Sequence, residues 1–490
     1  MNTMKKTFKY IVPVLALLQL TACTKSLNVT PNSEFSPGNV LTTEPGIRSL
    51  LYSSYANEQL QTNSRYWIND SEDCTDIGYN TDGAENGQLI QIINFNWTSN
   101  LGTFSGDIWA PSYASIRDAN GVIENIDNVK TTDAIKKQYK AEARVLRAQA
   151  YAWLYSFFGT VPLRTSTSSP GNLARCTDEQ LKTFVETEIT QSVADLPDPG
   201  KEVAFGRINK AIANGILAKF FLNTKQWQKA ADACQNIINF GYYSLYPVFA
   251  DMFRTANEQN REMILVLQCR NETDYSNWYQ CGALPAGYKS SPQFPAYNYL
   301  PTMSIFATNY RLRTAFVSTY APTDKRLATI CTSYINNAGN TINLLPNDNA
   351  RCFKYWDNAQ VGNNGGADVP IIRYADILLT RAEALNELNG PTVECFTLIN
   401  QVRSRAGIAP LTLVDAPTQD AFRDAILRER GWEFVGEGKR REDMIRQGKF
   451  LSSALARGIS ANNVTAGKVL FPIPQSEIDA NKLCVQNPGY

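Results

Sequence analysis

The sequence predicts a mostly α-helical protein, built as a tetratricopeptide-like stack of helix pairs that carries long irregular segments. Amphipathic helices joined by tight turns recur along the chain, and two long stretches rich in polar and aromatic residues show no helical periodicity. Paired amphipathic helices bury their apolar stripes against each other, and such hairpins stack into superhelical arrays. We therefore expect the helices to form the scaffold and the irregular segments to carry the function.

The clearest helix pair begins in the stretch 371–388. Its apolar residues recur at helical spacing and form one stripe, namely Ala375, Leu378, Leu379, Ala382 and Leu385. Asn389-Gly390-Pro391 ends this helix, because Asn or Gly accepts a left-handed terminal residue and Pro cannot continue a helix. A second helix repeats the stripe and closes at Gly407.

The remaining helices are predicted from the same periodicity. They are expected at 46–60, 108–129, 135–158, 181–196, 208–223, 227–240 and 421–434, with a short strand at 263–267. The scaffold then covers about 38–60, 104–260 and 368–490, within a domain spanning 38–490. The loop-rich segments fall at about 61–103 and 270–350, and irregular segments of this length inside a domain are usually functional.

Composition excludes several classes of function. The chain has 490 residues, 43% of them hydrophobic and 19% charged, with a net charge of +1, so no basic surface for nucleic acid is indicated. The sequence has no histidine. Histidine metal ligands, histidine general bases and Ser-His or Cys-His nucleophile pairs are therefore excluded.

The first 22 residues have the layout of a lipoprotein signal peptide. Three lysines precede an apolar run at 10–20, which is too short to span a membrane. Leu20-Thr21-Ala22-Cys23 then resembles a bacterial lipobox, which predicts a lipid on Cys23 and a polar tether at 23–37. The alternative is a plain signal peptide with an incidental cysteine, which is less favoured because no A-x-A cleavage site competes.

The nine other cysteines are scattered and form no C-x-x-C motif, so a zinc site is not predicted. An odd number cannot pair completely within one chain. Cys269 and Cys281 flank one loop, and the sequence leaves open whether they form a disulfide.

Six stretches together carry a resemblance to a known family. They are 140–164, 206–245, 369–388, 398–408 (LINQVRSRAGI), 425–449 (AILRERGWEFVGEGKRREDMIRQGK) and 470–490 (LFPIPQSEIDANKLCVQNPGY). On these motifs the chain resembles the SusD/RagB family of Bacteroidetes surface lipoproteins over nearly its whole length. It departs from the expected apolar or aromatic pattern at Gly431, Lys439 and Arg441.

The resemblance implies both a fold and a function. The fold would be four tetratricopeptide-like helix pairs in a right-handed superhelix, with an irregular segment that carries the ligand site. Members of the family sit on the outer membrane over a SusC-like TonB-dependent barrel and capture a nutrient for it. Most bind oligosaccharides, some bind peptides, and none is an enzyme or needs a cofactor.

The family motifs themselves read as structural. Oppositely charged residues recur at helical spacing and predict an ion-pair network between helices, namely Arg403, Arg405, Arg428, Glu429 and Glu433. Phe471-Pro472-Ile473-Pro474 predicts an ordered tail that lies over the helices.

The candidate ligand site therefore falls in the two loop-rich segments. Sugars present flat C–H faces and hydroxyl rims, so a site for them needs exposed aromatic rings beside amides and carboxylates. The residues with that chemistry are Trp67, Asn69, Asp70, Tyr79, Asn80, Trp278, Tyr279, Tyr288 and Tyr297. The alternative for each aromatic residue is a buried anchor, which is favoured for Trp109, Tyr113, Trp153 and Trp227 on helix stripes.

An acidic cluster raises other possibilities. Asp70, Glu72, Asp73 and Asp76, extended by Asp82 and Glu85, could supply the two carboxylates of a glycosidase, a solvated loop or a calcium site. No EF-hand pattern is present, and the aromatic loops argue against an adaptor that binds only protein. The sequence thus predicts an oligosaccharide-capturing lipoprotein that serves a TonB-dependent transporter, with peptide binding as the alternative.

Overall fold

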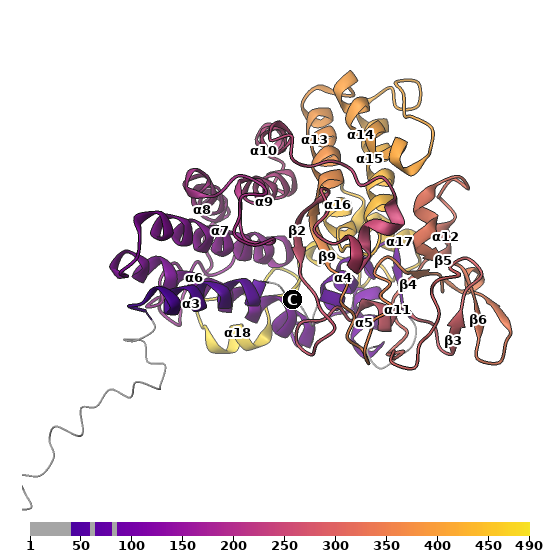
Figure 1. Cartoon of the computed structure of the whole chain (residues 1–490), viewed down its shortest axis with the longest axis horizontal. Helices are drawn as coiled ribbons and strands as arrows, with labels where there is room; N and C mark the ends of the chain where they lie inside the picture. The colour runs from indigo at the N-terminus through magenta and orange to yellow at the C-terminus, as the bar shows by residue number, and fades with distance from the viewer. Residues whose placement is uncertain (1–40, 59–63, 81–85) are drawn as a thin grey trace, which may run out of the picture.

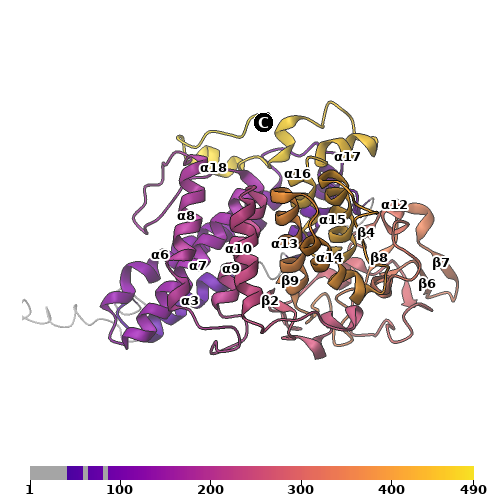
Figure 2. The ribbon, with the colours of Figure 1, turned by 90° about the horizontal axis from the view of Figure 1, so that it is seen from above.

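The helices form a continuous row of antiparallel pairs. The computed structural model describes residues 41–58, 64–80 and 86–490, so the predicted signal peptide, Cys23 and the tether lie outside it. Within these residues four pairs pack in sequence (Figures 1 and 2). They are α3 (Glu44–Glu58) with α6 (Ala110–Asn125), α7 (Asp133–Phe158) with α8 (Asp178–Thr190), α9 (Lys210–Asn223) with α10 (Trp227–Asn239), and α13 (Tyr374–Asn389) with α14 (Val393–Ala406).

Local sequence signals set the ends of these helices. At the start of α7 the Thr132 side chain accepts a hydrogen bond from the backbone N–H of Ile135, and Gly159 ends the helix with φ of 73°. Thr177 and Gln180 form a capping box at the start of α8. These caps satisfy backbone groups that the helices leave unpaired. Because such end signals are local, most of the predicted helices agree with the observed ones to within a few residues.

A two-stranded antiparallel ribbon joins the helical row to the loop-rich segment. It pairs β2 (Met263–Leu267) with β9 (Val369–Arg373), and all ten residues are buried. Residues 268–368 leave the row through β2 and return through β9. The predicted strand at 263–267 is confirmed, but the expectation of a helix from residue 371 is wrong, because 371–373 extend β9 and α13 begins at Tyr374.

The segment 268–368 holds short elements around a small aromatic core. They are α11 (Tyr279–Ala283), α12 (Thr314–Val317), the three-stranded sheet β3 (Tyr288–Ser290), β6 (Ser333–Asn336) and β7 (Thr341–Asn343), and the pair β5 (Ile330–Cys331) and β8 (Arg351–Cys352). Tyr288, Phe294, Phe353 and Trp356 pack together beneath them. In Figure 1 this segment lies beside α13–α16, away from α3 and α8.

The first predicted loop-rich segment, 61–103, is largely structured where it is described, so the expectation of an irregular stretch is wrong there. It contains α4 (Ser64–Glu72), β1 (Gly78–Tyr79) and α5 (Asn86–Ile93). The buried face of α4 includes Asn69, Asp70 and Glu72. Apolar periodicity cannot reveal a helix that buries polar side chains in this way.

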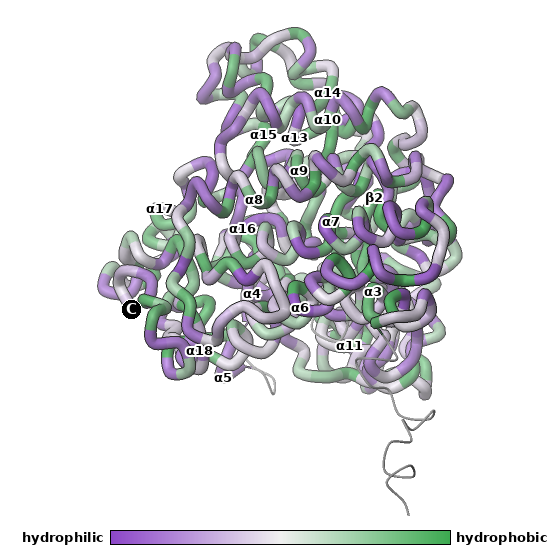
Figure 3. The backbone as a smooth tube through the Cα atoms, turned by 90° about the vertical axis from the view of Figure 1, so that its left-hand side faces the viewer, coloured by the Kyte–Doolittle hydropathy of each residue, from purple (hydrophilic) through white to green (hydrophobic). Residues whose placement is uncertain are grey.

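The C-terminal segment, from residue 419 onward, packs along the helical row. It comprises α15 (Gln419–Phe434), α16 (Arg440–Arg446), α17 (Phe450–Ala456) and α18 (Gln475–Ala480). The predicted tail over the helices is confirmed, since Phe471 is fully buried and stacks on Phe104 at 4.3 Å and on Phe157 at 5.7 Å. Hydrophobic and hydrophilic residues alternate along the helices in Figure 3, as expected of elements with one buried face.

The predicted ion-pair network is confirmed for four of its five residues. Arg403 pairs with Glu429 at 2.8 Å, and Arg405 pairs with Glu433. Arg428 is exposed and forms no ion pair among the described residues. The network extends further through two fully buried arginines, Arg326 and Arg373, which bridge α15 to the loop-rich segment and to β9.

Two of the three positions that depart from the family pattern, Lys439 and Arg441, are buried cations. The ammonium of Lys439 donates to the carbonyl of Ile371 at 2.6 Å, and burial lowers its pKa to about 8. The guanidinium of Arg441 lies 4.3 Å from the ring centre of Phe471. Cation–π contacts and carbonyl acceptors therefore replace the expected apolar packing.

Two further findings concern the whole described chain. Cys269 and Cys281 are both thiols, so no disulfide joins them. Among the described residues no helix is long and apolar enough to cross a membrane.

Candidate functional site

The structure divides the predicted ligand residues into a buried group and a half-exposed group. Trp67, Asn69, Asp70, Asn80, Tyr279 and Tyr288 are each at most 3% exposed. Tyr79, Trp278 and Tyr297 are half-buried. The expected exposure is thus wrong for the first six residues, because each fills a packing or hydrogen-bonding position inside the protein.

The buried aromatic residues support the fold. Trp67 on α4 contacts Trp153 edge-on at 5.1 Å, and Tyr279 packs between Tyr310 at 4.8 Å and Tyr355 at 5.2 Å. The hydroxyl of Tyr288 donates to the carbonyl of Tyr297 at 2.7 Å. These three rings anchor the elements that carry them, which is the alternative that the sequence left open.

Two of the three buried polar residues are held by hydrogen bonds. The carboxylate of Asp70 accepts a hydrogen bond from the Thr103 hydroxyl at 2.7 Å, and the amide of Asn80 donates to Asn86 at 3.1 Å. The side-chain nitrogen of Asn69 has no partner among the described residues.

Among the predicted aromatic residues, Trp278 has a ring orientation that hydrogen bonds fix. Its indole N–H donates to Ser276 and to the amide oxygen of Asn364, each at 3.0 Å, and these contacts fix the ring orientation. Phe306 contacts the ring edge-on at 6.0 Å and is itself half-buried. A tryptophan fixed in this way, with part of its surface accessible, can stack on a flat apolar face.

Tyr79 contacts the stretch 311–313, which follows Phe306 closely in the chain. β1 pairs with β4 (Arg311–Leu312), which places Tyr79 opposite Arg311, and the Arg313 guanidinium lies 4.8 Å from the Tyr79 ring centre. The backbone N–H of Phe306 donates to the carbonyl of Cys281 at 2.9 Å. Residues 306–313 thus connect the two predicted loop regions, and we call Tyr79, Trp278, Phe306 and Arg313 the loop face.

Tyr297 is held by several aromatic and cationic partners. Its ring stacks on Trp356 at 4.6 Å and on Phe294 at 5.0 Å, and the Arg254 guanidinium lies 4.4 Å from its centre. A ring with this many partners acts mainly as a packing residue of the small aromatic core.

The acidic cluster is a structural feature of α4 and the turn after it. Glu72 accepts hydrogen bonds from the backbone N–H groups of Gly436 at 2.9 Å and Gly438 at 3.0 Å, and Asp76 pairs with Arg440 at 2.7 Å. Burial raises the pKa of Glu72 to about 7, although these N–H groups lower it. Burial also raises the pKa of Asp70 and of Asp73 well above the ordinary range.

These environments overturn the solvated-loop interpretation, since Asp70, Glu72 and Asp73 are at most 4% exposed. Within the described residues no group of acidic or cysteine side chains is arranged to hold a metal ion. Asp82 and Glu85 lie outside the described residues.

Sequence reasoning missed Phe306 and Arg313. Phe306 stands in no periodic pattern, and its contact with Trp278 depends on a backbone hydrogen bond between segments far apart in sequence. The loop face combines three half-buried aromatic rings with a guanidinium. Such a set can contact C–H faces and donate hydrogen bonds to oxygen atoms, but it supplies no pair of opposed carboxylates for hydrolysis.

Two family models match this chain. The model described as the SusD family matches residues 332–490, and the model described as starch-binding, associating with the outer membrane, matches residues 27–222.

Curated relatives match over most or all of the chain. SusD-like protein P25 of Formosa agariphila is 27% identical over 98% of this chain and 99% of that protein. The starch-binding protein SusD of Bacteroides thetaiotaomicron is 25% identical over 73% of this chain and 74% of that protein.

Solved structures share the fold. A SusD homologue from Bacteroides thetaiotaomicron superimposes with a TM-score of 0.79 over 93% of this chain and 99% of its own, at 22% identity. A surface glycan-binding protein A from the same organism, solved in complex with laminarihexaose, gives a TM-score of 0.73 over 91% of this chain and 100% of its own, also at 22% identity.

Relatives whose names state a ligand bind starch or laminarin, and the family is non-enzymatic and is described as associating with the outer membrane. The predicted stack of helix pairs, the motifs at both ends of the chain and the full-length relatives agree. The chain is a member of the SusD/RagB family.

Proposed function

We propose that this protein captures an oligosaccharide at the cell surface and delivers it to a SusC-like TonB-dependent transporter in the outer membrane. The observation that carries the proposal is the loop face, where Trp278 is held by two hydrogen bonds and keeps part of its ring accessible beside Phe306. Starch and laminarin are named as ligands of relatives that share the family or the fold, which supports a glycan as the ligand class.

The geometry of the loop face suits transient capture. Each aromatic contact contributes about 0.5–1.5 kcal/mol beyond its buried area. Two or three such contacts with a few hydrogen bonds give modest affinity, and a protein that passes its ligand onward must release it. A half-exposed surface also accepts the middle of a chain, which a closed pocket would not.

The lipid on Cys23 would hold the protein at the membrane. Leu20-Thr21-Ala22-Cys23 supports lipidation of Cys23, and residues 24–40 would then link the lipid to the helical row. A tethered binding protein stays beside its transporter, which raises the effective concentration of captured ligand at the entrance.

Calorimetric titration of residues 24–490 tests the ligand class. The panel consists of laminarihexaose, maltohexaose, cellohexaose and a mixture of tetrapeptides. Saturable heat with one glycan is expected. Heat only with peptides would move this protein to the peptide-binding members of the family. Release of reducing ends during incubation would show that it is a hydrolase and would refute the proposal.

A further inference from the structure

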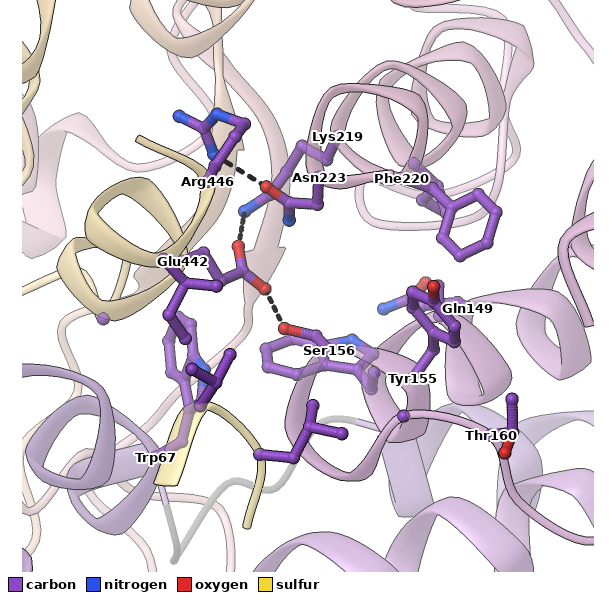
Figure 4. Close-up of a pocket in the computed structure, with 18 of the residues that line it drawn as sticks. Trp67, Gln149, Tyr155, Ser156, Thr160, Lys219, Phe220, Asn223, Glu442 and Arg446 are labelled. Atoms are coloured by element: carbon purple, nitrogen blue, oxygen red, sulfur yellow. Dashed lines mark hydrogen bonds and ion pairs between the residues drawn. The ribbon is translucent and has the colours of Figure 1, made fainter. Parts of the chain in front are cut away.

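A cavity of about 410 Å³ lies between the helical row and the C-terminal segment, away from the loop face. Helices α7 and α9 form one wall, and α16 with residues 469–488 forms the other. The ribbon residues Leu265 and Ile371 also line it, and Figure 4 shows the side chains around it. Its volume falls in the range of pockets that hold small molecules.

Four aromatic side chains of the described residues line the cavity, namely Trp67, Trp153, Tyr155 and Phe220. Trp153 and Tyr155 on α7 are half-buried, and Phe220 on α9 meets Tyr155 edge-on at 5.7 Å. Trp153 stacks on Phe157 at 6.0 Å on one side and contacts Trp67 at 5.1 Å. The sequence favoured a buried packing role for Trp153, but the ring is half-buried and lines the cavity.

One buried polar group in the cavity wall has no partner. Gln149 is 7% exposed, and its amide oxygen accepts no hydrogen bond from any described residue. In Figure 4 its amide lies at the cavity beside Tyr155 and Phe220. The oxygen has almost no accessible surface, so a ligand in the cavity does not reach it, and the amide nitrogen is the atom of Gln149 that can donate a hydrogen bond to a ligand.

Further hydrogen-bond donors line the cavity from α9. The Lys219 ammonium lies 4.0 Å from the Glu442 carboxylate, which is beyond hydrogen-bond length, and the amide oxygen of Asn223 accepts from Arg446 at 2.7 Å. Glu442 is held in place by the Ser156 hydroxyl. Lys219 and the amide nitrogen of Asn223 therefore retain donors that a ligand could use.

We infer that this cavity is a second carbohydrate-binding site, which takes a mono- or disaccharide unit. Sugar hydroxyls accept hydrogen bonds, so neighbouring hydroxyls can accept from the Gln149 amide nitrogen and the Lys219 ammonium, while the ring's C–H face lies on Trp153 or Phe220. A purely apolar ligand would leave these donors without an acceptor. The inference rests on the proposed function and extends it from one site to two.

The matched variants for this test are Gln149→Leu and Trp278→Ala. Leucine keeps much of the volume of glutamine and removes the unpaired amide, so Gln149→Leu should unfold at the same temperature as the wild type or higher. Trp278→Ala alters the loop face and leaves the cavity intact. Residues 24–490 of each variant are titrated with laminaribiose, cellobiose, maltose and the hexasaccharide that the wild type binds.

Gln149→Leu is expected to weaken disaccharide binding at least fivefold and to retain hexasaccharide binding, and Trp278→Ala should show the reverse. A crystal soaked with the disaccharide should show it against Trp153. Unchanged disaccharide affinity in Gln149→Leu would overturn the cavity site. A wild type that binds the hexasaccharide but no disaccharide would overturn it as well. Neither result would contradict the proposed function. A wild type that binds no saccharide would overturn both proposals.

Discussion

Replacing Arg373 by methionine should destabilise the fold more than replacing any exposed arginine. Arg373 ends β9 and is fully buried, with its guanidinium 2.7 Å from Glu262, 2.5 Å from Glu433 and 2.9 Å from Glu437. It thereby connects the ribbon at the base of the loop-rich segment to α15 and the turn after it. Methionine keeps part of the volume and removes the charge.

The expected loss follows from the charge balance of the network. Among the described residues five cations (Arg326, Lys354, Arg373, Arg403, Arg405) face five carboxylates (Glu262, Asp324, Glu429, Glu433, Glu437). Arg373→Met leaves one buried negative charge uncompensated. Removing one partner of a buried pair costs about 3–5 kcal/mol, a large part of the 5–15 kcal/mol by which proteins are typically stable.

Urea unfolding followed by circular dichroism measures the effect. Arg428→Met is the control, because Arg428 is exposed on α15 and forms no ion pair among the described residues. Adding Glu437→Gln to Arg373→Met should restore part of the stability, since it removes the surplus charge. A loss for Arg373→Met no greater than that for Arg428→Met would refute the reasoning.

Three further changes test other parts of the structure. Because burial raises the pKa of Glu72 to about 7, the folded protein holds a proton that the unfolded chain releases near pH 4.3. The free energy of unfolding of the wild type should therefore decrease as the pH rises from about 5 to 7. In urea titrations Glu72→Gln should show a smaller decrease over the same range. Gly438→Ala should lower the unfolding temperature, because Gly438 has φ of 65° and an added Cβ would lie 3.0 Å from the Trp67 ring; an unchanged temperature would contradict this. The Cys23→Ala variant should be recovered outside the membrane fraction. Its recovery in the membrane fraction would count against lipid anchoring.

The sequence predicted the helices well because their signals are local. Apolar spacing in α13 and α14, the Gly390 and Gly407 ends and the predicted ordered tail all survive in the structure. It failed on α4, whose buried face includes Asn69, Asp70 and Glu72, and distant partners hold the carboxylates of Asp70 and Glu72. It also extended α13 into β9, since Ile371 and Ile372 suit a buried strand and an apolar helix equally well.

The candidate site was harder to predict than the fold. Trp67 and Tyr288 lie in polar sequence, yet tertiary contacts bury both of them. Trp153 lies on a helix stripe, yet it lines a cavity because α9 and α16 do not fill the space beside it. Exposure depends on which segments meet in space, and a single sequence shows only neighbours along the chain.

The most direct test of the account is the dissociation constant of Trp278→Ala for the hexasaccharide that the wild type binds, measured by calorimetry. Loss of one aromatic contact of about 0.5–1.5 kcal/mol predicts affinity lower by roughly 2- to 13-fold. Trp227→Ala, a half-buried tryptophan on α10, is the control and should bind as the wild type does. Equal affinity for Trp278→Ala and the wild type would contradict glycan capture at the loop face.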